Sequence, residues 1–305
     1  MSYKNVLVAV EPNQEARAIA ARAREIAPDA DISVLAVLPD VVQAYGTVWS
    51  GDASGAMLDF VHGTREEAER QLRELLRNVG IAGERVQVKF GSPARVAHEM
   101  AQEMEADCIV AGCHGQHGIE LAFGSTANAL IHGLDCDAYL VRVGTGQESE
   151  PRPAAPRVVI AVDGTEDAHE VVEAGKALLN NGSQTTLITV IKPIAHTYGG
   201  LDLTVTGTES GAFEEEALRE GATWLDTIAT RHDLAADKRS VIGSPGHEIR
   251  TYAKEVNADL IVVGSHGRHG LGRLLGSTAN GVLHGVSCDV LVVRVAIGAH
   301  TEDAR

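Results

Sequence analysis

Short apolar runs alternate with amphipathic stretches along the whole chain of 305 residues. The run Asn5–Val10 is almost unbroken in its apolar character, which is typical of a strand buried on both faces. The residues at 13–27 then carry apolar side chains at helical spacing, and Pro28 ends that helix. In this half the pattern predicts strands at 5–10, 32–38, 85–90, 107–111 and 138–143. It predicts helices near 13–27, 64–79, 93–104 and 124–133.

The second half repeats this order of elements. Its strands are predicted near 157–162, 185–191, 238–242, 259–263 and 290–295, with helices between them. Parallel strands need long crossover connections, and the helices supply them. The pattern therefore predicts an α/β fold with one five-stranded, parallel, doubly wound sheet in each half and helices on both of its faces.

The repetition is also visible in the residues themselves. Gly91–Gly146 and Gly243–Gly298 align with a shift of 152 residues and no gap, and about half of the aligned positions are identical. The matches concentrate in Gly-x-His-Gly-x-His-Gly and in Gly-Ser-Thr-Ala-Asn. A repeat of this length indicates two tandem domains rather than a solenoid of small units. We therefore predict domain 1 at 1–146, a linker at 147–156 and domain 2 at 157–298.

The domain boundary falls in a polar, proline-rich stretch at 144–156 without an apolar period, as expected of a linker. Two other segments, 40–62 and 193–212, are rich in glycine and equally aperiodic. Loops of this length usually have a functional role or are mobile. We expect both segments to be flexible flaps that follow the second strand of each half.

Composition narrows the functional classes. The chain has 26 basic and 42 acidic residues and a formal net charge of −16 at pH 7, which disfavours binding to duplex nucleic acid. No run approaches the roughly 18 apolar residues of a membrane span, and the first residues lack the pattern of a signal peptide. The cysteines form no C-x-x-C pair, so reduced thiols in a cytoplasmic protein are expected. They are Cys108, Cys113, Cys136 and Cys288.

A candidate ligand site follows the fourth predicted strand of the second half. That strand leads into Gly264-Ser265-His266-Gly267, and the next helix is expected to open at Gly276-Ser277-Thr278. Glycines let the backbone approach a ligand, and hydroxyl and N–H groups at a helix start suit a phosphate. In open α/β sheets, ligands lie beyond the carboxyl ends of the strands. The alternative is that the glycines only make a tight strand exit and that Ser277 only caps the helix.

At this point the chain resembles a known family. The Gly-x-His-Gly exit, the Gly-Ser-Thr helix start, Val162-Asp163 after the first strand, and a closing Cys-Asp-Val-Leu-Val-Val-Arg strand resemble the universal stress proteins. The resemblance covers nearly the whole chain, in two copies. It implies Rossmann-like sheets of strand order 3-2-1-4-5, dimerisation through the last strand, and binding of an adenine nucleotide such as ATP or AMP, with or without Mg²⁺.

The resemblance also implies roles for single residues. Asp163 would lie near the ribose or adenine, Val190 would touch the base, and the glycine-rich loop would hold the phosphates. The full set of expected nucleotide-binding residues in the second half is Asp163, Val190, Gly264, Ser265, His266, Gly267, Arg268, Gly276, Ser277 and Thr278. The weaker set in the first half is Gly112, His114, Gly115, Gly124, Ser125 and Thr126.

The two halves are not equivalent in charge around this loop. Arg268 and Arg273 of the second half correspond to Gln116 and Leu121 of the first. The first half instead adds acidic residues, at Glu120 in the loop and at Glu11 in place of Asp163. Because cations stabilise a bound polyphosphate and anions oppose it, we expect the second half to be the one that binds nucleotide.

One spacing departs from the family signature. Eight residues separate Gly267 from Gly276, where the signature has nine, and the wording is closer to the branch of the enteric founding member. Several proteins of that branch are thought not to hold ATP. The first alternative is therefore a nucleotide-free scaffold that binds another small ligand or a protein partner. A weak ATPase is the second alternative, although no nucleophile and base pair repeats in the two halves.

The remaining expectations concern metals and partners. His114, His117 and His132 recur as His266, His269 and His284, but no zinc-type ligand spacing accompanies them, so no metal site is expected. We expect the halves to pack as an intramolecular pseudo-dimer through Ala138–Val143 and Val290–Val295, because exposed last strands would be unpaired edges. A homodimer is the further assembly that the resemblance implies.

Overall fold

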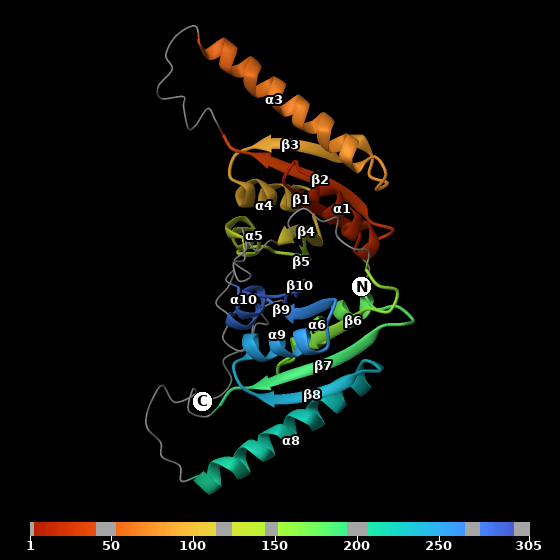
Figure 1. Cartoon of the computed structure of the whole chain (residues 1–305), viewed down its shortest axis with the longest axis vertical. Helices are drawn as coiled ribbons and strands as arrows, with labels where there is room; N and C mark the ends of the chain where they lie inside the picture. Colours follow the sequence, from red (N-terminus) through yellow and green to blue (C-terminus); the bar gives the residue numbers. More distant parts are fainter. Residues whose placement is uncertain are drawn as a thin grey trace. The chain divides into compact units, whose positions relative to one another are not determined.

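The computed structural model describes the chain at 3–40, 53–113, 124–143, 152–193, 207–265 and 275–295. The chain divides into two compact units, Ser2–Arg152 and Pro153–Arg305, which are described separately (Figure 1). Each unit contains five strands and four helices among its described residues. In the described part of the chain, no helix has the length and apolar character needed to cross a membrane.

The first unit has one parallel sheet with the strand order β3-β2-β1-β4-β5. Helices α1 and α3 contact each other and cover one face, and α4 and α5 cover the other (Figure 1). The strands are β1 (Asn5–Val10), β2 (Asp31–Leu38), β3 (Val86–Phe90), β4 (Cys108–Cys113) and β5 (Asp137–Arg142). The helices are α1 (Glu15–Ile26), α3 (Ala53–Leu76), α4 (Pro93–Glu103) and α5 (Ser125–Ile131), with a short 3₁₀ turn at Gly83–Arg85.

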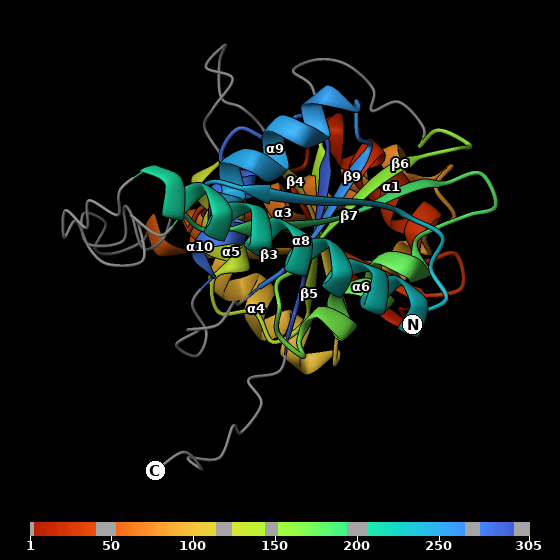
Figure 2. The same cartoon turned by 90° about the horizontal axis from the view of Figure 1, so that it is seen from below.

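The second unit repeats this arrangement, with the strand order β8-β7-β6-β9-β10 and parallel pairing throughout. Helix α8 lies along β7 and β8 (Figure 2), and α9 packs against α10. The strands are β6 (Arg157–Ala161), β7 (Gln184–Ile191), β8 (Asp237–Ile242), β9 (Leu260–Gly264) and β10 (Asp289–Val293). The helices are α6 (Ala168–Ala177), α8 (Gly207–Arg231), α9 (Pro245–Glu255) and α10 (Ser277–Leu283). The predicted fold class and the order 3-2-1-4-5 are confirmed in both units.

The apolar runs of the sequence form the centre of each unit. In β1, Val6, Leu7 and Val8 are completely buried, as expected of a central strand covered by helices on both faces. Helix α1 faces the sheet with small side chains and Ile19, which is 3% exposed. Packing there is tight, because a Cβ atom on Gly112 of β4 would lie 2.7 Å from Ile19 Cδ1.

The predicted flaps are partly wrong. Helix α3 begins at Ala53 and α8 begins at Gly207, so both long helices extend well into the segments that looked aperiodic. Phe60 of α3 is 61% exposed and Phe213 of α8 is 57% exposed, so the large apolar side chains at these two positions do not pack against the sheet. The sequence of these segments also has no helical period of apolar residues, and such a period is the signal from which a helix is recognised. The rest of both predicted flaps, at 41–52 and 194–206, lies outside the described residues.

Candidate functional site

The chain order of the second sheet reverses between β6 and β9. From β6 the chain adds β7 and β8 on one side and then crosses back to place β9 on the other side. The pairs Val159 with Ile261 and Ala161 with Val263 bring the carboxyl ends of β6 and β9 together. Open α/β sheets bind ligands at this kind of switch point, because the connections from the two strands diverge to opposite faces.

Two predicted site residues lie level with each other at this edge. Val190 is near the end of β7. Ala161 of β6 pairs with Ile188 of β7, and the pairing continues beyond it, because Val162 N–H donates to the Ile188 carbonyl oxygen at 3.0 Å. This register sets Asp163 beside Val190. Both residues are half-buried. A carboxylate and an apolar side chain therefore border the same edge of the sheet.

The turn after β6 holds the Asp163 carboxylate in one orientation. Its Oδ1 accepts a hydrogen bond of 3.2 Å from Thr165 N–H and a second from the Thr165 hydroxyl. No hydrogen bond from the described residues reaches Oδ2. One oxygen thus fixes the local turn, and the other remains able to accept a hydrogen bond from a ligand hydroxyl.

Ser265 has a structural role at the exit of β9. It is 7% exposed, its N–H donates to the Val293 carbonyl oxygen at 2.8 Å, and its hydroxyl oxygen accepts from Val295 N–H at 3.3 Å. Its carbonyl oxygen accepts from Gly276 N–H at 2.7 Å. Ser265 therefore fixes both ends of the glycine-rich loop. The intervening His266, Gly267 and Arg268 lie outside the described residues, as does Arg273.

The alternative in which Ser277 only caps the helix is wrong. Gly276 occupies the N-cap position of α10, with φ −63° and ψ 154°, and no side-chain cap is present. Ser277 is the first helical residue and is exposed, while Thr278 is half-buried. The first unit has the same arrangement, with Gly124 as the N-cap of α5. The Ser277 hydroxyl is consequently not used for capping.

A close crossing of two helices positions α10. A Cβ atom on Gly246 of α9 would lie 2.7 Å from backbone atoms of Gly281 in α10. The two backbones approach this closely because neither residue has a side chain. The first unit has Ala94 and Ala129 at the corresponding positions. Packing against α9 through a pair of glycines, which the first unit lacks, therefore holds α10 and with it Ser277.

The first unit has a different set of groups at its corresponding edge. Gly112 packs against α1, Gly124 is the N-cap of α5, and Thr126 is exposed. Ser125 begins α5, and His114 and Gly115 lie outside the described residues. In place of Asp163 there is the exposed Glu11, whose Oε2 accepts a hydrogen bond of 3.4 Å from Asn13. This exposed carboxylate is not held as that of Asp163 is.

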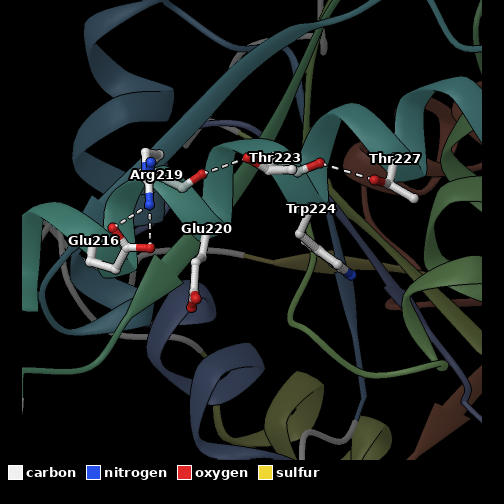
Figure 3. A pocket seen from close by; sticks show the side chains of 6 residues that line it. All are labelled: Glu216, Arg219, Glu220, Thr223, Trp224 and Thr227. Atoms are coloured by element: carbon white, nitrogen blue, oxygen red, sulfur yellow. Dashed lines mark hydrogen bonds and ion pairs between the residues drawn. The ribbon is translucent and has the colours of Figure 1, made fainter.

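The structure also shows two features that the sequence did not single out. One is a shallow hollow of about 330 Å³, whose whole lining comes from α8 (Figure 3). Its lining residues are Glu216, Arg219, Glu220, Thr223, Trp224 and Thr227. Arg219 is paired with both oxygens of Glu216 at 2.5 and 2.6 Å. The other is a histidine pair, His169 and His232, whose members are 63 residues apart and have no periodic signal.

Comparisons with known proteins agree with the duplicated fold. The model of the universal stress protein family matches residues 2–142 and again residues 155–294. Universal stress protein A homolog 2 of Coxiella burnetii is 37% identical over 139 residues, which is 45% of this chain and 92% of that protein. A universal stress protein of Mycobacterium tuberculosis is 27% identical over 209 residues, 67% of each chain.

A solved structure gives the same result for the fold over the full length. The crystal structure of a universal stress protein from Archaeoglobus fulgidus covers 95% of this chain and 98% of its own, with a TM-score of 0.63 and 16% identity. At this level of identity the likeness concerns the fold alone. With the two family matches, which span both units, the conclusion is that the chain belongs to the universal stress protein family and contains its domain twice.

Proposed function

We propose that the second unit binds an adenine nucleotide at the carboxyl ends of β6 and β9 and acts as a sensor or regulator in the stress response. The observation that carries this proposal is the alignment of Asp163 with Val190 beside the exit of β9, at the switch point of the sheet. The residues suit the ligand: Val190 offers an apolar contact for the base, and Asp163 Oδ2 offers an acceptor for ribose hydroxyls.

The phosphates would lie toward the start of α10. The exposed Ser277 hydroxyl is not engaged in capping, and Thr278 follows it. Backbone N–H groups at a helix start favour anions, and the loop sequence adds Arg268 and Arg273. Mg²⁺ would neutralise part of the phosphate charge. The first unit, with Glu11 in place of Asp163 and Glu120 in its loop, is the poorer site.

Calorimetric titration of the nucleotide-stripped protein with ATP and Mg²⁺ tests the proposal. A stoichiometry near one supports a single site in the second unit, and a stoichiometry near two contradicts our distinction between the units. If neither heat nor thermal stabilisation is observed, the proposal is wrong and the nucleotide-free scaffold is the better account. Slow release of phosphate from bound ATP would instead support the weak ATPase.

Two matched variants locate the site. Asp163→Asn keeps an oxygen to accept from Thr165, so the turn is preserved while the charged acceptor for the ribose is lost. Losing a charge-assisted hydrogen bond of about 1.5–3 kcal/mol weakens binding roughly 10- to 150-fold. Glu11→Gln in the first unit is the control and leaves the affinity unchanged. Replacing Ser277 by tryptophan should abolish binding while the protein stays folded; unchanged affinity would contradict the assignment of the phosphate site.

Further expectations remain predictions. They are the cytoplasmic location, the domain boundaries at 1–146 and 157–298, and the pairing of Ala138–Val143 with Val290–Val295 in an intramolecular pseudo-dimer. Light scattering on the purified protein distinguishes a monomeric chain from the homodimer that the family resemblance implies.

A further inference from the structure

In the second unit, four side chains form a continuous chain of contacts between α6 and the end of α8. His169 and Glu173 lie on α6, Arg231 is the last residue of α8, and His232 follows it. His169 Nδ1 is 2.6 Å from His232 Nε2, and His232 Nδ1 is 2.5 Å from Glu173 Oε1. Arg231 reaches His169 Nε2 through its guanidinium group. The His232 side chain is only 8% exposed, so this pairing joins the two helices in a sheltered position.

Arg231 and Glu173, at the two ends of this series of contacts, fix the positions of the protons on the histidine rings. Arginine can only donate, so His169 Nε2 must accept and the ring proton of His169 must be on Nδ1. His169 Nδ1–H then donates to His232 Nε2, and His232 Nδ1–H donates to the Glu173 carboxylate. Both rings are therefore neutral and protonated on Nδ1, and all four ring nitrogens are used.

An additional proton cannot enter this arrangement without breaking a contact. It would bind either His169 Nε2, which faces an arginine N–H, or His232 Nε2, which faces the N–H of His169. In either case a donor would face a donor. Glu173 does not take up the proton first, because the hydrogen bond from His232 lowers the pKa of its carboxyl. Acid must therefore break at least one contact between α6 and the end of α8, either that of Arg231 with His169 or that between the two rings.

The surrounding charges determine the direction of the effect. Burial lowers the pKa of His169, the positive charge of Arg231 and the charge that His232 would carry if protonated act in the same direction, and Glu166 and Glu173 oppose them without reversing the result. Lys176 lies on the same helix and donates to the backbone carbonyl of His232. A histidine whose pKa in the folded state is below the ordinary value of about 6.5 loses stability as the pH falls below that value.

We propose that Arg231, His169, His232 and Glu173 form a proton-sensitive latch, which ties the end of α8 to α6 at neutral pH and releases it in acid. The first unit has no such latch, because Arg17 and Ala21 occupy the positions of His169 and Glu173. It keeps only the equivalent of the hydrogen bond from Lys176 to the His232 carbonyl oxygen: Arg24, at the position of Lys176, donates to the Gly80 carbonyl oxygen at 3.1 Å. This backbone hydrogen bond is thus shared by the two units, and the proton-sensitive latch is specific to the second.

The latch is not a metal site. In the described part of the chain, no group of three or more His, Cys, Asp or Glu side chains is arranged to hold a metal ion. The ligand that the latch recognises is the proton itself. The proposal is independent of nucleotide binding, since it rests on contacts between α6 and the end of α8 alone.

Hydrogen exchange in the full chain measures the opening of the latch. The amides of His232, Asp233 and Leu234 donate to carbonyl oxygens of the last turns of α8, at 3.1, 3.2 and 2.9 Å. After correction for intrinsic exchange, uptake of one proton on opening raises their opening constant by up to tenfold for each pH unit below about 6.5. An opening constant that is the same at pH 7.5 and pH 5.0 would overturn the proposal.

Three variants separate the latch from a general effect of acid. His169→Gln removes the acid-dependent increase, whereas His247→Gln, which changes an exposed histidine on α9 of the same unit, keeps it. Glu173→Gln keeps an acceptor oxygen but removes the charge that favours a protonated ring, so acid opens the latch further. An unchanged pH dependence in His169→Gln would contradict the proposal.

The ring nitrogens give an independent measurement that needs no substitution. At pH 7.5, ¹⁵N spectra should show both His169 and His232 neutral with the proton on Nδ1. Either ring protonated on Nε2 at that pH would refute the assigned chain of donors and acceptors, even if acid loosened α8 for another reason.

Discussion

The crossing of α9 and α10 provides a direct test of how tightly the second unit is packed. Gly246→Ala would add a methyl group 2.7 Å from both the carbonyl carbon and the Cα of Gly281. Ordinary contacts begin near 3.4 Å, so the helices must separate by about 0.7 Å. Backbone atoms cannot rotate away as a side chain can. Overpacking of this kind costs about 1–3 kcal/mol.

The loss is measurable by calorimetry of the full chain. For a unit of about 150 residues, each kcal/mol lowers the melting temperature by about 2–4 °C, so we expect a decrease of about 2–12 °C in the second unit. Gly211→Ala in α8 is the matched control, because a Cβ there has no neighbour within 4 Å. Alanine is the better residue in a helix interior by roughly 0.5–1 kcal/mol, so this variant should melt about 1–4 °C higher.

The two variants should change the melting temperature in opposite directions. Both make the same chemical change in a helix of the same unit, and they differ in what the methyl group meets. If Gly246→Ala stabilised the protein as much as Gly211→Ala, the close approach of α9 and α10 would be refuted. The crossing of α9 and α10 would then be wide enough for alanine, which is the residue that the first unit has at both corresponding positions, Ala94 and Ala129.

Three other substitutions or reactions have expected outcomes. Ser265→Ala leaves the buried N–H of Val295 without its hydroxyl acceptor and should lower the free energy of unfolding by about 1–3 kcal/mol in urea titration; no change would show that this bond is not formed. Tyr3→Phe removes the 2.8 Å hydrogen bond to the Asp137 carboxylate and should cost about 1.5–3 kcal/mol in the first unit, measured the same way. Burial raises the pKa of the Cys136 thiol to about 12, so its alkylation at pH 8 should be roughly a thousandfold slower than that of free cysteine, and an equal rate would contradict the described environment.

The fold could be predicted because its information is local and repeated. Most strands are apolar runs bounded by polar residues, and the order of elements recurs after 152 residues, so the run at 5–10 and the run at 157–162 support each other. The early turns of α3 and α8 could not be predicted in the same way. A helix is recognised in a sequence by its period of apolar residues, and these segments have none; Phe60 and Phe213, their large apolar residues that the structure describes, are exposed.

The candidate site was predictable only in part. The exits of β6 and β9 follow from the order of elements, which sets Asp163 and Gly264 at one edge of the sheet. The Ser-Thr pair suggested a side-chain cap, but a glycine can also occupy an N-cap, and in Gly276 it does. The latch gave no signal in the sequence, because His169 and His232 are brought together only when the end of α8 comes to lie beside α6 in the folded unit.

The hydrogen bond from Gly276 N–H to the Ser265 carbonyl oxygen has a consequence for protein engineering. It joins the two anchor points of the glycine-rich loop at 2.7 Å, and each anchor is held by elements that do not include the loop: Ser265 by β10, and α10 by α9. The segment at 266–274 can accordingly be exchanged as a cassette. A peptide of similar length grafted there would start and end at fixed points, so binding specificity could be replaced without redesigning the sheet.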